Sequence, residues 1–526
     1  MNDIFKNKKR IINCKKDWNS CPKCNIQFEN YNQYKTCTNC GYNFKMTCND
    51  RLDLICDSGT FQEIDNENKN DKDNIIIGVA NINGYKVAIG IMDSFNMAGS
   101  IGVYLINKLC YLISYAKNYH LPLIIFSASG GIRVQEGVKA LVGMSKLSEV
   151  INEYKKNGLF ISFLTNATYG GLNASLSMLG DIIISEKDCK IGFSGTRVIK
   201  NELHQDLPDN FQTTEFNYEN GLIDIIVSRD KEKGIISRIL EQYNNKNNKN
   251  NENNEKAIVK REIKEYTKKM DKLELIKEIR TEKHIRPYNI VENIFRSFIE
   301  IHGDRISKDD NSIKCGFAKL DDMFVSIAYV DRRNNINENI ITNFGMINPE
   351  GYRKVNRFVK LSEKLNSPII FFVDTPGANA GYEAEKNGQA VAIANLLQDI
   401  SKIKVPIISF ITGEANSGGA IALITGDYLV MLEHSYLSVI SPEAYIDIIY
   451  KGKEKIENVI NELNILPTDM LHNKIIDEII EDNNDEKLME EIKTIINNKI
   501  IELSNITKEE LLNKRKRRIK NWGKYE

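Results

Sequence analysis

The sequence predicts an α/β protein made of two copies of one unit, preceded by a small metal-binding head. Four cysteines near the start of the chain follow a CxxC…CxxC pattern. Two long sections then alternate apolar, strand-like runs with helical segments, and each contains a glycine pair directly after such a run, at Gly170-Gly171 and at Gly418-Gly419. A chain of 526 residues is too long for one ordinary core, which leaves room for a duplication.

The cysteine head spans residues 1–50. The segment CPKC contains Cys21 and Cys24, and the segment CTNC contains Cys37 and Cys40, with twelve residues between the two pairs. Two CxxC turns supply the four thiolates that a tetrahedral zinc ion requires, so we expect a structural zinc ribbon. Free thiols or two disulfides are the alternative. Disulfides are disfavoured because the remaining cysteines are scattered, as is usual in a reducing compartment.

Composition divides the rest of the chain into two sections and a linker. Residues 51–242 and 257–526 are the two α/β sections. Between them, residues 243–256 are rich in Asn and Lys and contain too little apolar surface to fold, which predicts a linker. The second section opens with apolar positions at helical spacing over 256–280, and the chain ends in a basic helical segment.

Charge and hydropathy exclude several classes of protein. Lys and Arg total 71, and Asp and Glu also total 71, so the formal net charge is zero. No field of the whole chain therefore favours nucleic acid or an anionic membrane. We expect no secretory signal, because the first residues alternate basic and apolar, and no apolar stretch is long enough to cross a bilayer. We expect a cytoplasmic protein with no membrane partner.

The two sections repeat one order of elements. Each has three apolar runs typical of buried parallel strands, opened by Pro or Gly and closed by small turn residues. The runs span 121–131, 158–171 and the segment from Asp181, and then 367–378, 405–419 and the segment from Asp427. A helix is expected between the first two runs, at 136–155 and at 388–402. Any parallel-sheet domain could give this spacing, but the matching glycine pairs favour two copies of one unit.

The glycine pairs suggest a chemical role. A strand that ends in Gly-Gly and turns into a helix presents backbone N–H groups that no side chain covers. The first strand of each triplet also ends at glycine, at Gly131-Ile132 and at Gly377-Ala378. Amides from two neighbouring strand ends can form an oxyanion hole, so the chain would contain two. Close packing of helix on strand is the alternative; a phosphate loop is disfavoured, because neither GxxxxGK[ST] nor GxGxxG follows these strands.

Several runs resemble a known enzyme. SASGGIRVQEG, TNATYGGLNASLSMLGD and KIGFSGTRVI, together with the cysteine head, resemble the β subunit of the bacterial and plastid acetyl-CoA carboxylase carboxyltransferase. HIRPYNIVENIFRSFIEIHGDR, NFGMINPEGYRK, DTPGANAGYEAEKNGQAVAIA, GEANSGGAIALITGD and SVISPEAY resemble its α subunit. The motifs stand in order and cover nearly the whole chain outside the linker. The sequence is therefore similar to a fusion of β and then α.

The resemblance implies a fold, a reaction and partners. The fold is two crotonase-like domains of the ClpP/crotonase superfamily behind a zinc ribbon. The reaction transfers a carboxyl group from carboxybiotin to acetyl-CoA, which gives malonyl-CoA for fatty acid biosynthesis. The biotin arrives on a biotin carboxyl carrier protein, which an ATP-dependent biotin carboxylase charges, so zinc is the only resident cofactor expected. The assembly implied is a homodimer that corresponds to α2β2.

The resemblance implies roles for the two glycine pairs, and the internal repeat and the shared fold extend these roles to the partner amides. The hole for the thioester oxygen of acetyl-CoA is assigned to Gly170, Gly171 and the amides of Gly131 and Ile132. The hole that binds biotin and stabilises its ureido oxygen is assigned to Gly418, Gly419 and the amides of Gly377 and Ala378. The freed ureido nitrogen would act as the base, which explains why no side-chain base is evident.

The chain departs from the family pattern at a few positions near these turns. They are Asn166 and Ala167 in place of Asp-Pro, Thr196 in place of Pro, Ala415 and Asn416 in place of Gly-Gly, and a less basic segment over 331–342 that keeps Arg332 and Arg333. These changes concern the affinity for CoA or biotin more than the class of reaction.

Two alternatives remain at this point. A related carboxyltransferase could act on propionyl-CoA or another acyl-CoA, although the zinc head favours acetyl-CoA. A degenerate enzyme could instead bind nucleic acid through the ribbon, next to a run of basic residues, Lys6, Lys8, Lys9, Arg10, Lys15 and Lys16. Binding that weakens steeply with salt and disappears when residues 1–50 are deleted would support the second hypothesis.

Overall fold

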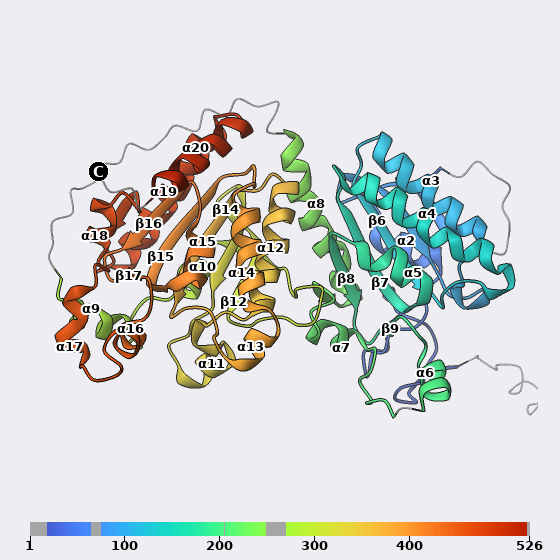
Figure 1. Cartoon of the computed structure of the whole chain (residues 1–526). Helices are drawn as coiled ribbons and strands as arrows, with labels where there is room; N and C mark the ends of the chain where they lie inside the picture. The colour runs from blue at the N-terminus through green and yellow to red at the C-terminus, as the bar shows by residue number, and fades with distance from the viewer. Residues whose placement is uncertain (1–17, 65–74, 205, 249–269, 523–526) are drawn as a thin grey trace, which may run out of the picture. The chain divides into compact units, whose positions relative to one another are not determined.

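The computed structural model describes residues 18–64, 75–204, 206–248 and 270–522. The chain divides into two compact units (Figure 1), one within Met1–Phe216 and Ile226–Glu241 and the other within Asn217–Ile225 and Gln242–Glu526. The short segment Asn217–Ile225 therefore belongs to the second unit, although it precedes the predicted linker. There the ring of Tyr218 stacks on His302 with 3.7 Å between the centroids.

The first unit is built on a sheet with the order β10-β8-β7-β6-β5-β4-β3, with β9 paired to β7. Strands β3 to β5 pair antiparallel, whereas β5 to β8 pair parallel. The strands are β3 (Gln62–Glu63), β4 (Ile75–Ile82), β5 (Tyr85–Met92), β6 (Leu123–Ser129), β7 (Phe160–Tyr169), β8 (Ile182–Glu186), β9 (Ile191–Gly192) and β10 (Ile225–Val227).

The second unit repeats this topology strand for strand. Its sheet has the order β11-β12-β13-β14-β15-β16-β18, with β17 paired to β15. The strands are β11 (Arg296–Glu300), β12 (Ile313–Leu320), β13 (Met323–Val330), β14 (Ile369–Thr375), β15 (Ile407–Asn416), β16 (Tyr428–Leu432), β17 (Tyr436–Ser438) and β18 (Glu478–Ile480). The two predicted copies of one unit are confirmed, because the two sheets share one strand order and one pattern of antiparallel and parallel pairs.

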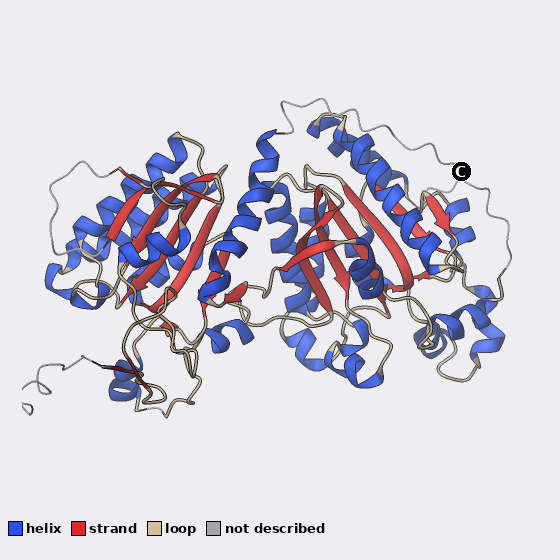
Figure 2. Ribbon diagram, turned by 180° about the vertical axis from the view of Figure 1, so that it is seen from behind, coloured by secondary structure: helices blue, strands red, loops and turns tan. Residues whose placement is uncertain are grey.

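Helices cover the parallel strands of both sheets, as Figure 2 shows. Every residue of β6 and of β14 is buried, because parallel strands of this kind are covered on both faces. The helices that follow the same strands in the two units are α3 (Val103–Asn118), α4 (Val138–Lys155) and α5 (Gly170–Ser175), and α12 (Pro349–Lys364), α14 (Gln389–Ile400) and α15 (Ser417–Ile424). The helices predicted at 136–155 and 388–402 are thus confirmed as α4 and α14.

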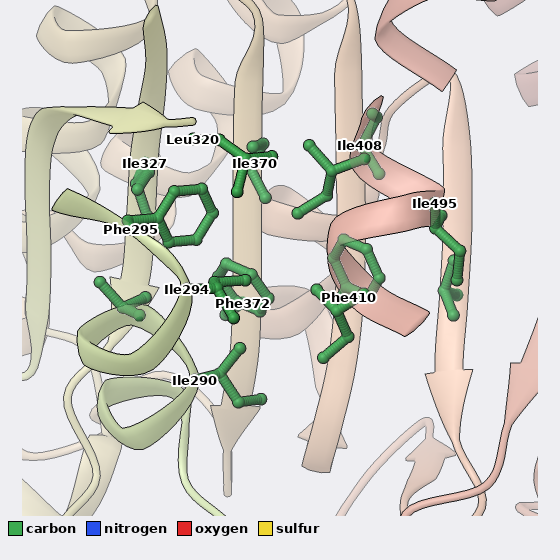
Figure 3. Close-up of a cluster of buried hydrophobic side chains, with 14 of the residues drawn as sticks. Ile290, Ile294, Phe295, Leu320, Ile327, Ile370, Phe372, Ile408, Phe410 and Ile495 are labelled. Atoms are coloured by element: carbon green, nitrogen blue, oxygen red, sulfur yellow. The ribbon is translucent and has the colours of Figure 1, made fainter. Parts of the chain in front are cut away.

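The core of the second unit shows how these layers pack. Ile290 and Ile294 of α10 (Pro287–Ile294) and Ile495 of α19 (Asp485–Ser504) lie against Phe372 of β14 and Phe410 of β15 (Figure 3). Each of these side chains is buried. Removing one such side chain from water stabilises the fold by roughly 1.5–3 kcal/mol. This packing fixes the position of β14 and β15, whose ends form a glycine turn.

The remaining helices connect or flank these elements. They are α2 (Cys48–Ile55), α6 (Thr196–Leu203), α7 (Thr214–Glu219), α8 (Glu232–Asn248), α9 (Lys272–Ile279), α11 (Ile336–Ile341), α13 (Tyr382–Lys386), α16 (Pro442–Ile449), α17 (Ile456–Val459), α18 (Pro467–His472) and α20 (Lys508–Asn521). The basic C-terminal helix is confirmed as α20, and α9 confirms the end of the helix predicted over 256–280. None of the described helices is long and apolar enough to cross a membrane.

Two segments predicted from the sequence lie partly or wholly outside the described residues. Helix α8 continues to Asn248, so the first residues of the predicted linker 243–256 are helical, and residues 249–256 lie outside the described residues. The basic run between Lys6 and Lys16 also lies outside them.

Candidate active site

The first glycine turn joins the ends of β6 and β7. Strand β6 ends at Ser129, and the chain then passes through Gly131, whose φ is +113°. Strand β7 ends at Tyr169 and α5 begins at Gly170, whose φ is +63°. A β-carbon on Gly170 would lie 3.0 Å from the Cα of Gly131. The two turns therefore touch backbone to backbone, and both positions need glycine.

The second glycine turn has the same construction at the ends of β14 and β15. Gly377 follows β14 with a φ of +132°, and α15 begins at Ser417 with a φ of +63°. A β-carbon on Gly419 would lie 2.6 Å from the backbone nitrogen of Ala378, whereas one on Gly418 would meet nothing within 4 Å. Gly419 is thus required for close packing, and Gly418 faces open space.

Strand register shows which residues correspond in the two turns. Ser129 pairs with Thr168 across β6 and β7, and Thr375 pairs with Ala415 across β14 and β15. The next residues, Tyr169 and Asn416, therefore correspond, and each is the N-cap residue of the helix that follows. Gly170 then corresponds to Ser417, and Gly171 to Gly418. The two glycine pairs are offset by one residue.

Hydrogen bonds within the first turn leave only part of its backbone free. The Gly131 N–H donates to the Ser129 hydroxyl at 3.0 Å, and the Gly170 N–H donates to the Phe193 carbonyl at 2.9 Å. By contrast, the Ile132 N–H meets no acceptor among the described residues. The amide that follows Gly170 lies in the first turn of α5, where N–H groups have no partner within the helix.

The second turn shows the same distribution. The Gly377 N–H donates to the Thr375 hydroxyl at 3.0 Å, while the Ala378 N–H meets no acceptor in the part of the chain that the structure describes. Gly418 and Gly419 lie in the first turn of α15. Of the amides predicted from the sequence, those of Ile132, Gly171, Ala378, Gly418 and Gly419 remain available for a ligand. Such a group of donors suits an oxygen that gains negative charge.

A buried ionic network supports the second turn. The Asp374 carboxylate, next to Thr375, pairs with Arg286 at 2.7 Å and with Arg332 at 3.0 Å. Burial alone would raise the pKa of Asp374, but the two guanidinium groups outweigh it and lower the pKa to about 2. Asp374 is therefore ionised, and its Oδ1 also accepts a hydrogen bond from the Glu414 N–H at 3.0 Å. This bond ties the ends of β14 and β15 together.

Glu414 extends the network toward α15. Its carboxylate pairs with Arg280 at 2.8 Å and with Arg332 at 3.2 Å, and it accepts a hydrogen bond from the Tyr436 hydroxyl at 2.9 Å. The Asn416 side chain donates to the same hydroxyl at 3.1 Å. Asn416, a departure from the family pattern, is thus held in place as the N-cap residue of α15. Sequence reasoning missed this network, although an Asp inside a buried apolar strand was a usable signal.

A cavity lies beside the end of the first sheet. Its lining includes Lys45 and Thr47 from the cysteine head, Asp93 after β5, and Thr165 and Asn166 in β7. The head therefore forms one wall of a cavity at the carboxyl ends of the strands, where ligands of parallel sheets usually bind. Asn166, another departure from the family pattern, faces this cavity.

The four cysteines of the head form a compact cluster. The Sγ atoms of Cys21 and Cys40 are 3.6 Å apart, and those of Cys24 and Cys37 are 3.7 Å apart. A tetrahedral zinc ion with bonds of about 2.3 Å to sulfur separates its ligands by about 3.8 Å, so the cluster fits zinc. A hydrogen bond from the Asn39 side chain is the main reason that the pKa of Cys24 falls to about 6, whereas desolvation is the main reason that the pKa of Cys40 rises to about 12. The thiols are free, as metal ligation requires.

Comparisons with known proteins agree with these features. A family model described as acetyl co-enzyme A carboxylase carboxyltransferase-like matches residues 230–523. A Clostridium tetani protein named acetyl-coenzyme A carboxylase carboxyl transferase subunits beta/alpha is 37% identical, over 97% of this chain and 93% of its own. A Natranaerobius thermophilus protein of the same name is also 37% identical, over 97% and 91%. An alpha subunit from Clostridium botulinum is 41% identical over 45% of this chain and 88% of its own.

Solved structures share the fold. A transcarboxylase 12S structure, with methylmalonyl-coenzyme A and methylmalonic acid bound, has a TM-score of 0.70 at 20% identity and covers 86% of this chain and 90% of that one. A single-chain, multi-domain long-chain acyl-CoA carboxylase has a TM-score of 0.64 at 15% identity, over 86% and 47%. The predicted crotonase-like fold is confirmed. With its four-cysteine cluster and two repeated units, the chain belongs to the acetyl-CoA carboxylase carboxyltransferase family, with β and α parts fused.

Proposed function

We propose that this protein transfers the carboxyl group of carboxybiotin, carried on a biotin carboxyl carrier protein, to acetyl-CoA and so forms malonyl-CoA for fatty acid biosynthesis. The observation that carries the proposal is the repeated turn. In both units, an amide after β6 or β14 that meets no acceptor among the described residues stands against the first turn of the helix after β7 or β15. Two such turns suit a reaction in which negative charge appears on two different oxygens.

The amides of Ile132 and Gly171 are assigned to the thioester oxygen of acetyl-CoA. Removing the α-proton of a thioester places negative charge on that oxygen, and two backbone donors stabilise it there. Loss of one such donor costs about 2.7–4 kcal/mol of transition-state stabilisation in comparable sites.

The second turn is assigned to biotin. The amide of Ala378, with those of Gly418 and Gly419, stabilises the negative charge on the ureido oxygen when the carboxyl group leaves. Biotin supplies the nitrogen that takes the α-proton, in keeping with the absence of a free side-chain base from the turns as described. The Asp374 and Glu414 network holds the two strand ends in this geometry.

Zinc and the partner proteins complete the proposal. The four cysteine thiolates would hold one structural zinc ion, which would stabilise the fold of the ribbon. The protein works with a biotin carboxylase, which charges the carrier, and we place it in the cytoplasm. Acetyl-CoA is favoured over propionyl-CoA because the curated relatives are named for acetyl-coenzyme A carboxylase.

We also propose a homodimer. Near the first turn, Val138, Leu141 and Val142 of α4 are exposed apolar side chains. Near the second, Tyr382 of α13 and Val391 of α14 are exposed as well. Apolar helix faces beside both turns favour a second copy of the chain as the occupant of each. The charge introduced by Leu141→Asp should shift the sedimenting species from dimer to monomer; an unchanged dimer would exclude α4 from the interface.

The experiment that tests the function uses the zinc-loaded full chain with charged biotin carrier and acetyl-CoA. We expect malonyl-CoA to form, and we expect the reverse decarboxylation of malonyl-CoA in the presence of carrier. Acetyl-, propionyl- and butyryl-CoA are compared as acceptors. Folded, zinc-loaded protein that transfers no carboxyl group to any of them would contradict the proposal.

A further inference from the structure

The hydroxyl of Tyr352 lies against the second turn, next to Gly419. The residue lies in α12 and is 0% exposed, and its Oη has no hydrogen-bond partner among the described residues. A β-carbon on Gly419 would lie 2.5 Å from this oxygen and 2.6 Å from the Ala378 nitrogen. The phenol and the Ala378 N–H, which meets no acceptor in the described parts of the chain, thus face the same side of Gly419.

The corresponding position of the first unit carries no hydroxyl. An isolated parallel bridge joins Ile101 to Ile132 in the first unit, and Ile347 to Ala378 in the second. Counting from these bridges, the position of Tyr352 corresponds to Ile106, which is buried and apolar in α3.

The space around the two turns differs accordingly. In the first unit, Leu172 stands at the position of Gly419. The Ile132 side chain packs against the same turn, with its Cγ1 2.3 Å from a β-carbon on Gly171. In the second unit, the corresponding residue is the smaller Ala378, and the Tyr352 hydroxyl reaches the turn instead. Ile132 and Ile106 of the first unit thus correspond to the smaller Ala378 and to Tyr352 in the second.

Packing alone does not explain the hydroxyl. A buried donor without an acceptor destabilises the folded state, and phenylalanine would fill the same volume without that penalty. Burial raises the pKa of Tyr352, so the phenol keeps its proton and remains a donor. An O–H group that is fixed in place but free to rotate can orient its dipole toward negative charge nearby.

We propose that Tyr352 is a positioning residue of the second turn, whose hydroxyl dipole acts behind the Ala378 and Gly419 amides to stabilise the negative oxygen that they bind. The inference rests on the proposed function and extends it. The two turns differ in kind, because the turn assigned to the ureido oxygen has a polar support and the turn assigned to the thioester oxygen has an apolar one.

The test replaces only the hydroxyl. In the full-length, zinc-loaded protein, Tyr352→Phe should lower kcat for carboxyl transfer about tenfold, which is about 1.4 kcal/mol in the barrier. The KM for acetyl-CoA should stay within about twofold, because the first turn is untouched. The Tm should stay the same or rise, because an unsatisfied buried donor has been removed.

Tyr154→Phe is the matched control. Its hydroxyl is buried in α4 and lies 2.8 Å from the carbonyl oxygens of both Leu121 and Leu159. Its removal should lower the Tm and leave kcat unchanged. If Tyr352→Phe keeps the parent's kcat, or loses activity only in proportion to lost folded protein, the inference is overturned. A parent without carboxyl transfer would instead remove the proposed function and the inference together.

Discussion

Gly170 and Ser417 adopt the same φ of +63° at corresponding positions, the first residues of α5 and α15. Glycine occupies this left-handed region freely, whereas a residue with a β-carbon pays roughly 1–2 kcal/mol there. The second unit therefore keeps the backbone of the turn even where its sequence does not favour it. The geometry of the turn is common to both units, and the residue that achieves it is not.

Replacing Ser417 by glycine should relieve this strain. We expect Ser417→Gly to stabilise the protein by about 1 kcal/mol and to raise the Tm by about 2–4 °C, with turnover retained. Differential scanning calorimetry measures the shift. Ser401→Gly is the control, because Ser401 has an ordinary helical φ of −62° and glycine there should lower the Tm. A lower Tm in both variants would contradict strain at Ser417.

Gly418 and Gly419 should respond differently to a methyl group. Gly418→Ala has open space for its β-carbon and improves helix propensity, so the fold should be kept or stabilised. Turnover should nevertheless fall at least about tenfold, because the methyl group enters the space assigned to biotin. Turnover equal to that of the parent would remove biotin from this position.

Gly419→Ala is the companion variant. Its β-carbon would press on the backbone nitrogen of Ala378, so stability and turnover should fall together. Thermal unfolding and steady-state transfer, measured side by side on the two variants, separate a blocked site from a distorted turn. A Gly419→Ala protein as stable as the parent would show that the turn can shift without loss.

Zinc should depend on Cys24. The parent should contain about one zinc per chain by elemental analysis, and Cys24→Ser should lose it, with a lower Tm for the ribbon. Cys110→Ser, at a buried cysteine in α3 outside the cluster, should retain the metal. Full zinc content in Cys24→Ser would exclude this residue as a ligand.

Asp374 should make the second unit sensitive to acid. Its pKa is lowered in the folded protein, so its contribution is fully present above about pH 4 and is lost as the pH falls toward 2. Asp374→Asn removes the carboxylate that pairs with Arg286 and Arg332, although Arg332 keeps its pair with Glu414. The change should cost about 3–5 kcal/mol of unfolding free energy near neutral pH.

Denaturant unfolding at several pH values tests this prediction. The free-energy difference between parent and Asp374→Asn should shrink between pH 4 and pH 2, because the parent loses its ion pairs there. Asp399→Asn, which breaks a partly exposed pair with Lys360, is the control and should cost less than about 1 kcal/mol. A difference independent of pH would show that Asp374 does not act through its charge.

The sequence predicts the strands and turns that depend on neighbouring residues alone. Buried strands such as β6 and β14 read as continuous apolar runs, and the glycine turns follow them directly. The one-residue offset between the two glycine pairs could not be predicted, because it depends on the strand register in both sheets. The sequence also could not show that the Gly170 N–H already donates a hydrogen bond, because its acceptor, the Phe193 carbonyl, lies in a later loop.

The supporting groups of the second turn come from distant parts of the chain. Arg280, Arg286 and Arg332 converge on Asp374 and Glu414 from before and after three strands of the sheet. No spacing rule relates these positions, because the sheet topology alone brings them together. Tyr352 is hidden for a different reason: on an amphipathic helix, a tyrosine on the buried face looks like an ordinary core residue.

The segment Asn217–Ile225 gives the chain an interleaved order. It precedes α8 and the Asn/Lys-rich stretch, yet it contributes to the second unit, where Asp224 pairs with Arg357 at 2.8 Å. A protease cut after Asn248 would therefore not separate the two units. The amino-terminal fragment would still contain Asn217–Ile225, which belongs to the second unit. The two fragments should copurify as a nicked complex, and the α-like half expressed alone should need that segment supplied on another polypeptide.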